Sequence, residues 1–426
     1  MAEKQLNFYR YRYEIRNIVL TMDKDYPIRD EMALSFSMLW DFSRRKLPVL
    51  QLNIQLEKDL IVTLFKYKET TKIKFDIYET QYEGESWDNK LGTSLWLTHS
   101  FNIIPLRELG YYTSAVDTEL LNEIDPMAQP QGVELYLIDL DIVNKFTQEL
   151  SINAKDISKP ALLQGLFSMR NIPAKEVIAT PPEDSSVVDK VVLSLGSLVA
   201  NIDELNMRYG IYSAGIVLFH DLTNLYCINR VTPNIEIPST NDFDSVTFLL
   251  PNPNAPEITM SGGYTDLEMK KHYIMLNGKP EIYDYKAMIN PVEFSTMETI
   301  DAEGTVDKIT LDPESTKMNY QYKHNTLSVD QEINEKIMTD QIVTFTIADS
   351  PISFFKPYKT YTFITDTMYN VLDLNNHIYR LNYLEFGIAR EGAYFESSMQ
   401  IKMVRVSKTS GNREVTFAEY YKNAQG

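Results

Sequence analysis

The stretch that decides the fold is residues 193–230, LSLGSLVANIDELNMRYGIYSAGIVLFHDLTNLYCINR. Its first part has apolar residues at the spacing of one helical face, which predicts a helix through Leu195, Leu198, Val199, Ile202 and Leu205. Gly210 is suited to end this helix, because glycine adopts a positive φ without steric cost. Two apolar runs follow, at 216–219 and 225–228, and Asp221 to Asn224 between them predict a turn. The passage therefore predicts a helix packed on a β-hairpin.

Helical spacing also occurs before this passage. It is seen in two groups of apolar residues: Ile142, Val143, Phe146 and Leu150, and then Leu162, Leu163, Leu166 and Phe167. Asp139-Leu140-Asp141 resembles the start of a calcium loop but lacks the turn glycine and the closing glutamate. We interpret it as a helix N-terminus, where acidic residues favour the helix dipole. Pro181-Pro182 marks a loop, so this region is predicted to be α+β.

Both ends of the chain show the two-residue period of half-buried strands. Apolar residues alternate with polar ones near the N-terminus at 9–15, 50–56 and 72–77, and near the C-terminus at 343–347, 361–365 and 399–404. Charged turn signals separate the N-terminal segments: Asp23-Lys24-Asp25, Lys58-Asp59 and Lys68-Glu69-Thr70-Thr71. Prolines are frequent in residues 233–256, and the pattern near 327–338 predicts a short amphipathic helix. We predict an α+β, mostly β fold, with two related barrels and peripheral α+β modules.

Composition limits the classes of function. A length of 426 residues predicts roughly three domains. The net charge of −18 argues against duplex DNA or anionic lipid as a binding partner. Cys227 is the only cysteine, which excludes an intrachain disulfide and disfavours a cysteine-based zinc site. The charged N-terminus does not resemble a signal peptide, and the longest charge-free apolar stretch, 191–202, is shorter than the ~18 residues of a membrane span.

No motif for chemistry is present. The five histidines are far apart and none has metal-ligand spacing: His99, His220, His272, His324 and His377. The nearest approaches to a serine-nucleophile elbow, around Ser194 and Ser94, do not match it. Gly262-Gly263-Tyr264 lacks the glycine spacing and lysine of a phosphate loop. We therefore expect no catalytic residue, no metal and no cofactor.

A glycosidase remains an alternative. Such an enzyme needs only two suitably separated carboxylates, and the 59 acidic residues offer many pairs. Trp87, Trp96 and Tyr82 are candidates for a platform that stacks on sugar rings, although residues of this kind more often fill a core or an interface.

The helix and hairpin of the opening passage resemble an element of hub proteins from phage tails and baseplates. In that family, a helix ends in a Tyr-Gly-Ile-Tyr-like corner and leads into a hairpin with a Phe-x-Asp turn and an aromatic second strand. The matching residues here are Tyr209, Gly210, Ile211, Tyr212, Gly215, Phe219, Asp221 and Tyr226. The resemblance covers about residues 160–230, and elsewhere only the layout of β and α+β regions matches. The motif contains no catalytic residue, so it predicts a structural corner.

The resemblance implies two tube-forming β-barrel domains with peripheral α+β modules. The predicted domains are a first barrel at 1–110, a module at 111–235, a second barrel at 236–265 and 340–410, an inserted module at 266–339, and a tail at 411–426. The implied assembly is a homotrimer in the virion baseplate that adapts a sixfold tail tube to a threefold spike. Its partners would be tube, spike and other baseplate proteins, with DNA only a transient passenger through the channel during ejection and with no membrane insertion.

The resemblance further implies synthesis in the cytoplasm of the bacterial host. No fused lysozyme or peptidase segment is recognisable at either end, so we expect a structural protein and no enzyme. The alternatives are a distal-tail or receptor-contacting baseplate component, which would form a hexamer or bind host glycans, and a cell-wall glycosidase.

Overall fold

The computed structural model describes most of the chain but not all of it. The described residues are 7–42, 46–67, 70–84, 87–103, 131–179, 182, 185–212, 216–229, 245–250, 262–266, 271–275, 281–284, 296–300, 306–310, 341–356, 360–365 and 377–408. The predicted helix near 327–338 and the tail at 411–426 lie outside these residues, and most of the predicted Pro181-Pro182 loop does too.

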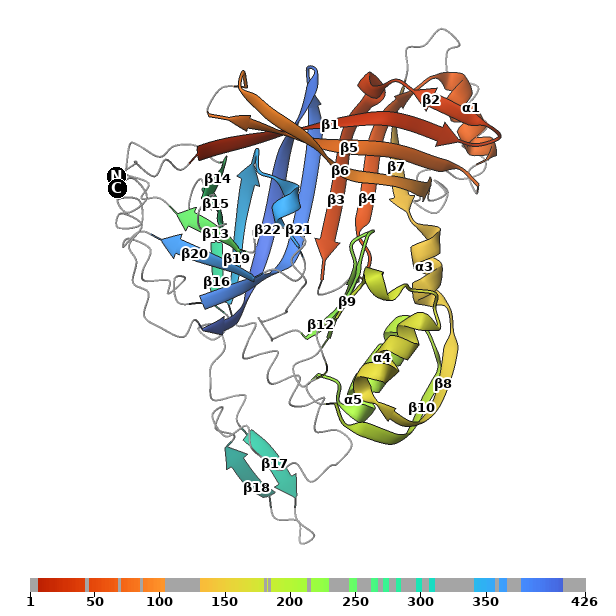
Figure 1. Ribbon diagram of the computed structural model, residues 1–426, viewed down its shortest axis with the longest axis vertical. Helices are drawn as coiled ribbons and strands as arrows, with labels where there is room; N and C mark the ends of the chain where they lie inside the picture. Colours follow the sequence, from red (N-terminus) through yellow and green to blue (C-terminus); the bar gives the residue numbers. More distant parts are fainter. Residues whose placement is uncertain are drawn as a thin grey trace.

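The predicted mostly β architecture is confirmed. One large sheet dominates the molecule, in the order β14-β15-β13-β20-β21-β3-β4-β7-β6-β5-β1-β22-β19-β16 (Figure 1). Its first strands are β1 (Asn7–Thr21), β2 (Asp25–Ile28), β3 (Ala33–Asp41), β4 (Val49–Leu56), β5 (Lys72–Glu83), β6 (Lys90–Ile103) and β7 (Gln131–Ile138). The later ones are β13 (Ser245–Leu250), β14 (Gly262–Asp266), β15 (Lys271–Met275), β16 (Glu281–Asp284), β19 (Gln341–Ala348), β20 (Thr360–Thr365), β21 (His377–Glu391) and β22 (Tyr394–Lys408).

The alternating segments form strands with one buried face, as predicted. In β1, Tyr9, Tyr11, Tyr13 and Ile15 are buried, while the arginines between them are only partly buried. The same alternation buries every second residue of β4 from Leu50 to Leu56. Lys58-Asp59 was predicted to be a turn, and this was wrong: these residues begin helix α1 (Lys58–Lys66). A two-residue charge signal does not distinguish a turn from the exposed first turn of a helix.

Three strands have more than one partner along a single edge. β1 pairs with β5 on one side, and with β14, β22 and β2 in succession on the other. β21 pairs with β22 along its length, and its other edge is shared between β20 and β3. β22 meets β1 at the pair Tyr13 and Phe395, and then β19 from Ser398 onward. These shared strands connect the two ends of the sequence.

The sheet closes on itself through two circuits of paired strands. Circuit A runs β1-β5-β6-β7-β4-β3-β21-β22 and returns to β1. Circuit B runs β1-β14-β15-β13-β20-β21-β22 and returns to β1. β1, β21 and β22 belong to both. In Figure 1, β3, β4 and β7 lie to the right, where β1, β5 and β6 cross over them.

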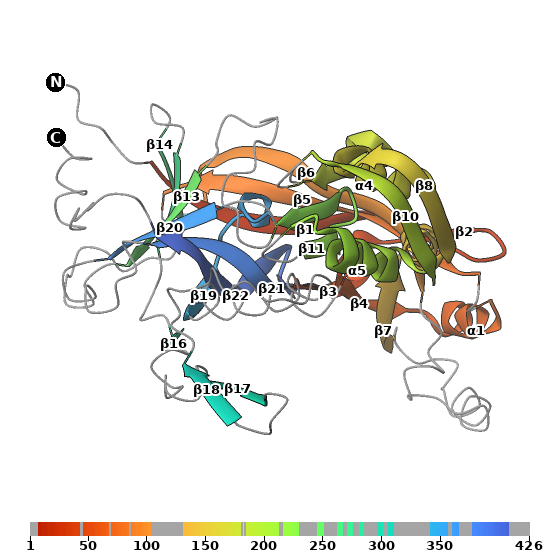
Figure 2. The ribbon, with the colours of Figure 1, turned by 90° about the horizontal axis from the view of Figure 1, so that it is seen from below.

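The division into two barrel domains stays a prediction, because strands from both predicted ranges are hydrogen-bonded within one sheet. The ranges predicted as peripheral modules also contribute to this sheet: β7 comes from 111–235, and β15 and β16 come from 266–339. A separate hairpin, β17 (Thr296–Ile300) and β18 (Val306–Thr310), lies away from the sheet (Figures 1 and 2).

A small α+β module follows β7. It contains α3 (Leu140–Thr147), β8 (Leu150–Ser158), α4 (Lys159–Ser168), β9 (Val177–Ala179), β10 (Val187–Gly196), α5 (Leu198–Tyr209), β11 (Ile216–His220) and β12 (Leu225–Asn229). In Figure 1 the module lies below β3, β4 and β7. The three helices were predicted, with two differences at their ends. Leu150 begins β8, because α3 ends at Thr147, and Leu195 lies in β10, because α5 begins only at Leu198.

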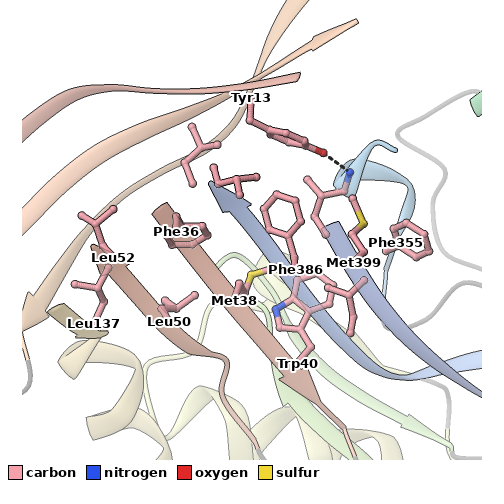
Figure 3. Close-up of a cluster of buried hydrophobic side chains, with 14 of the residues drawn as sticks. Tyr13, Phe36, Met38, Trp40, Leu50, Leu52, Leu137, Phe355, Phe386 and Met399 are labelled. Atoms are coloured by element: carbon pink, nitrogen blue, oxygen red, sulfur yellow. Dashed lines mark hydrogen bonds between the residues drawn. The ribbon is translucent and has the colours of Figure 1, made fainter. Parts of the chain in front are cut away.

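Two hydrophobic cores result. Core 1 lies within the large sheet, where Phe36, Met38 and Trp40 of β3 pack among side chains from neighbouring strands such as Leu50, Leu52 and Phe386 (Figure 3). Core 2 lies within the module and includes Phe146, Leu166, Val191, Ile202 and Leu205.

Candidate functional site

The predicted corner forms where α5 meets the hairpin β11–β12. Ser197 caps the start of α5, since its Oγ accepts a hydrogen bond from the Ala200 N–H at 3.3 Å. The helix ends at Gly210, which has φ 64° and ψ 71° and donates its N–H to the Asn206 carbonyl at 2.9 Å. This left-handed conformation disfavours residues with a Cβ atom, which explains a glycine here.

Side chains fix the direction of the chain after Gly210. The Asn206 Oδ1 accepts a hydrogen bond from the Tyr212 N–H at 2.8 Å. Lys159, a buried residue at the start of α4, donates from Nζ to the Gly210 carbonyl at 2.9 Å. Ile211 and Tyr212 are both fully buried. The helix end is therefore held by α4 as well as by its own last turn.

Tyr209 joins the corner to the neighbouring ribbon of β8 and β10, because its hydroxyl accepts a hydrogen bond from the Val192 N–H at 3.1 Å. Gly215, another residue of the predicted motif, lies outside the described residues.

Asp221 organises the hairpin turn. Its Oδ1 accepts hydrogen bonds from the N–H groups of Thr223 at 3.0 Å and Asn224 at 2.8 Å. Its Oδ2 accepts a hydrogen bond from the Tyr226 hydroxyl at 2.6 Å. One carboxylate thus holds both the turn and the second strand, as is typical of aspartate at the first position of a turn. The structure brings these motif residues together with Phe219, at the end of β11.

The hairpin forms a wall between the two cores. Val217 and Phe219 of β11, with Tyr226 and Ile228 of β12, belong to core 1. The alternate residues Leu218, Leu225 and Cys227 belong to core 2. Phe219 contacts Phe42 and Trp40 edge-on, with centroid distances of 4.5 and 6.1 Å. The corner therefore attaches the module to the large sheet.

This role as a wall was missed in the sequence, although a signal exists. The runs Ile216 to Phe219 and Leu225 to Ile228 are continuously apolar. Such runs are typical of strands that are buried on both faces. In strands with one solvent-exposed face, apolar and polar residues alternate.

The reactive side chains of the hairpin are buried. Burial raises the pKa of the Cys227 thiol to about 12, so the thiolate is scarce at neutral pH. Burial lowers the pKa of His220 to about 4, and its Nδ1 accepts a hydrogen bond from the Leu222 N–H at 3.1 Å. These features are typical of structural residues.

Asp139 caps helix α3, which confirms its interpretation as a helix N-terminus. Its Oδ1 accepts a hydrogen bond from the Ile142 N–H at 3.0 Å, and its Oδ2 lies 2.6 Å from His99 Nε2. Burial raises the pKa of this carboxyl, but the hydrogen bonds from His99 and Ile142 outweigh burial and the net pKa is lowered.

The candidate sugar platform does not present open aromatic faces. The Trp87 ring has the guanidinium groups of Arg10 and Arg12 at 3.8 and 3.7 Å from its centroid, and Tyr82 meets it edge-on. Trp96 packs against core 1, where it contacts Phe36 and Phe386. The three residues are therefore not arranged as one stacking surface.

Within the described ranges, no three His, Cys, Asp or Glu side chains are grouped so as to hold a metal ion. Among the same residues, no helix combines the length and apolar character needed to cross a membrane.

A protein-family model described as Bacteriophage PBS1 gene 109 protein matches residues 4–275 of the chain. No curated protein matches the chain by sequence.

Several solved structures align with the chain at TM-scores below 0.5. The tail protein from Neisseria meningitidis MC58 aligns with a TM-score of 0.45 and 11% identity, over 92% of this chain and 96% of that one. The E. coli c3393 protein is described as a component of the type VI secretion system with structural similarity to T4 bacteriophage tail proteins gp27 and gp5. It aligns with a TM-score of 0.37 and 8% identity, over 95% and 79% of the two chains. The lidded Francisella PdpA-VgrG complex aligns with a TM-score of 0.36 and 8% identity, over 97% of this chain and 56% of that one. At these TM-scores no role is transferred from the neighbours to this chain.

Proposed function

The chain belongs to the Bacteriophage PBS1 gene 109 protein family, and from this premise we propose that it is a structural protein of the virion. Its proposed place is the tail baseplate, where it acts as a hub between tube and spike. The corner residues Tyr209 to Tyr212, which resemble those of hub proteins, support this proposal. The protein would be made in the cytoplasm of the bacterial host and incorporated into the particle.

The observation that carries the proposal is the closure of the sheet into two circuits that share β1, β21 and β22. Closed circuits occupy strand edges and leave few of them open to unwanted pairing with other chains, which suits a subunit that forms part of a ring wall. Three copies with two circuits each would present six circuits toward a sixfold tube. The same three copies would present threefold symmetry toward a spike. A homotrimer therefore suits an adaptor between the two symmetries.

In this proposal the ring surrounds the DNA channel. The net charge of −18 suits a channel wall that repels passing DNA, so that the DNA does not adhere during ejection. The structure of the ring within the particle tests this idea through the side chains that line the lumen. A neutral or basic inner wall would remove the channel role.

The proposed role is not enzymatic, and wall-degrading activity would belong to a partner. Purified protein added to cell-wall material tests this directly. Clearing of the suspension would revive the glycosidase alternative, whereas a stable turbidity supports the structural role.

The assembly is tested by light scattering of the purified full chain, alone and mixed with tube and spike proteins of the same phage. A trimer, or a trimer that forms only with the spike, supports the hub. A hexameric ring would favour a distal-tail component instead. A monomer that binds neither the tube protein nor the spike protein would overturn the proposal.

A further inference from the structure

A buried carboxyl group lies where β5 meets the segment that follows β19. This segment, residues 349–355, includes a short 3₁₀ helix at Ile352–Phe354 and leads to β20 of circuit B. Glu79 lies on β5, which belongs to circuit A alone, and only 6% of its surface is exposed. Its Oε1 accepts a hydrogen bond from the Ser353 hydroxyl at 2.9 Å. The carboxyl group therefore connects circuit A to the segment that leads into circuit B.

The Tyr13 hydroxyl, on β1, lies at the centre of this junction. Its oxygen accepts a hydrogen bond from the Ile352 N–H at 2.9 Å, the contact dashed in Figure 3. Two acceptors compete for its single hydrogen: the Ser350 carbonyl at 2.9 Å and Glu79 Oε2 at 3.3 Å. One phenol hydrogen cannot serve both acceptors. With an ionised Glu79, either the buried Ser350 carbonyl loses this donor, or Glu79 Oε2 keeps only the long hydrogen bond from the Ser353 N–H, at 3.4 Å.

A proton on Glu79 removes the conflict. The Glu79 Oε2–H group then donates to the Tyr13 oxygen, which has a second lone pair, and Tyr13 donates to the Ser350 carbonyl. Each of these polar groups has a partner in this arrangement, as buried polar groups require. An ionised carboxylate at this depth would instead need a cation, and none of the described Lys, Arg or His side chains forms an ion pair with Glu79.

The surrounding groups are consistent with a neutral junction. Burial raises the pKa of Glu79, more than the hydrogen bonds from Ser353 and Tyr13 lower it. The phenols of Tyr11 and Tyr13 on β1 are also buried, and burial raises the pKa of each, so both stay neutral. From the facing segment, Asp349 is bound by Arg10 at 2.5 Å. From β6, Ser94 contributes only an uncharged hydroxyl, 3.5 Å from the Glu79 carbonyl.

We propose that Glu79 carries a proton in the folded chain, and that this proton latches segment 349–355 onto β1 and β5. When the proton leaves, a buried carboxylate without a cation remains, and the two circuits are joined more weakly at this point. The latch is a pH-dependent device of the fold, and it does not depend on the proposed role in the virion.

The pH dependence has a defined sign. Because the folded-state pKa is raised above the ordinary value of 4.5, the stabilisation is complete below 4.5 and is lost as the pH rises through the folded-state pKa. Glu79→Gln cannot ionise, and its amide donates to Tyr13 while its oxygen accepts from Ser353. We therefore compare the unfolding equilibrium constants of the two proteins. The constant of the unmodified protein, relative to that of Glu79→Gln, should rise by up to tenfold per pH unit between pH 4.5 and the folded-state pKa.

Chemical unfolding of the full chain at a series of pH values measures this ratio. Glu83→Gln is the matched control, because Glu83 lies on the same strand but forms an exposed hydrogen bond with Asn89. This control should leave the pH profile of the unmodified protein unchanged. Hydrogen exchange of residues 349–355 should increase with pH in the unmodified protein by more than the increase in the intrinsic exchange rate. In Glu79→Gln this excess should be smaller.

Infrared spectroscopy keeps the proposal falsifiable even if Glu79→Gln fails to fold. At about pH 6 exposed carboxyl groups are almost fully ionised, so a carboxylic-acid band there reports protonated buried groups. We expect this band in the unmodified protein and its decrease in Glu79→Gln. Absence of the band from the unmodified protein, or the same pH profile for both proteins, would overturn the latch.

Discussion

Asn206 accepts the backbone N–H of Tyr212 on its side-chain oxygen, at 2.8 Å, and so determines where the chain goes after α5. Both residues are buried. Asn206→Ala removes the acceptor and leaves this N–H without it, which is expected to reduce the free energy of unfolding by about 1–3 kcal/mol. Chemical denaturation measures the change. Met207→Ala is the control, because Met207 is half exposed on the same helix, and its effect should stay within about 0.5 kcal/mol.

Gly210 and Gly165 differ in backbone conformation, and the same substitution should have opposite effects at the two positions. Gly210→Ala places a Cβ on a residue with φ 64°, so we expect a loss of about 1–2 kcal/mol. Gly165 lies inside α4, and a Cβ there meets no atom within 4 Å. Gly165→Ala should therefore stabilise the protein by roughly 0.5–1 kcal/mol. Equal effects in denaturation experiments would contradict the left-handed helix end.

The Asp221 and Tyr226 pair is suited to a double-mutant cycle. Tyr226→Phe keeps the buried ring and removes the hydroxyl that donates to Asp221 at 2.6 Å. Because the acceptor is a carboxylate, we expect a coupling free energy of about 1.5–3 kcal/mol between Tyr226→Phe and Asp221→Ala. Tyr383→Phe serves as the control, since its bond to Glu385 is exposed and its loss should be small. Additive effects of the two hairpin substitutions would show that the bond contributes nothing.

Phe219 and Leu218 are neighbours in β11 but belong to different cores. Phe219→Ala should cost about 3–5 kcal/mol, and Leu218→Ala about 2–5 kcal/mol. Hydrogen exchange separates the two effects by location. Phe219→Ala should mainly increase exchange in β3, which ends near Trp40, whereas Leu218→Ala should mainly increase exchange in α5 and β10. The same exchange pattern in both variants would mean that the hairpin does not divide the cores.

His220 gives the protein a second pH dependence, at acidic pH. Its pKa is lowered by burial to about 4, so the stabilisation is present above the ordinary value of 6.5 and is lost as the pH falls toward 4. The loss should reach about 3 kcal/mol, from ~1.4 kcal/mol per pH unit. His220→Asn retains an acceptor for the Leu222 N–H and does not ionise, so its stability should fall less on acidification. Denaturation curves between these pH values compare the two proteins, and parallel profiles would contradict the prediction.

Local structure was predictable because side-chain pattern and backbone conformation are directly linked. The alternation at Tyr9 to Ile15 and at Leu50 to Leu56 predicted strands with one buried face, and the helical spacing before Tyr209 predicted α5. Gly210 predicted the left-handed helix end, and Asp221 predicted the turn. Each of these features depends on interactions within a few residues. The sequence by itself therefore determined the elements of the corner and the mostly β class.

Tertiary structure alone decided how the strands close. The pair of Tyr13 with Phe395 joins both circuits, yet neither residue indicates the other, because backbone hydrogen bonds between strands are the same for every residue type. The proton conflict at Tyr13 and Glu79 likewise appears only when Ser350 and Ile352 of segment 349–355 approach β1 and β5. Trp87 illustrates the same limit, since its ring faces are covered by arginines of β1. Contacts between distant segments depend on the geometry of the whole sheet, which no local pattern encodes.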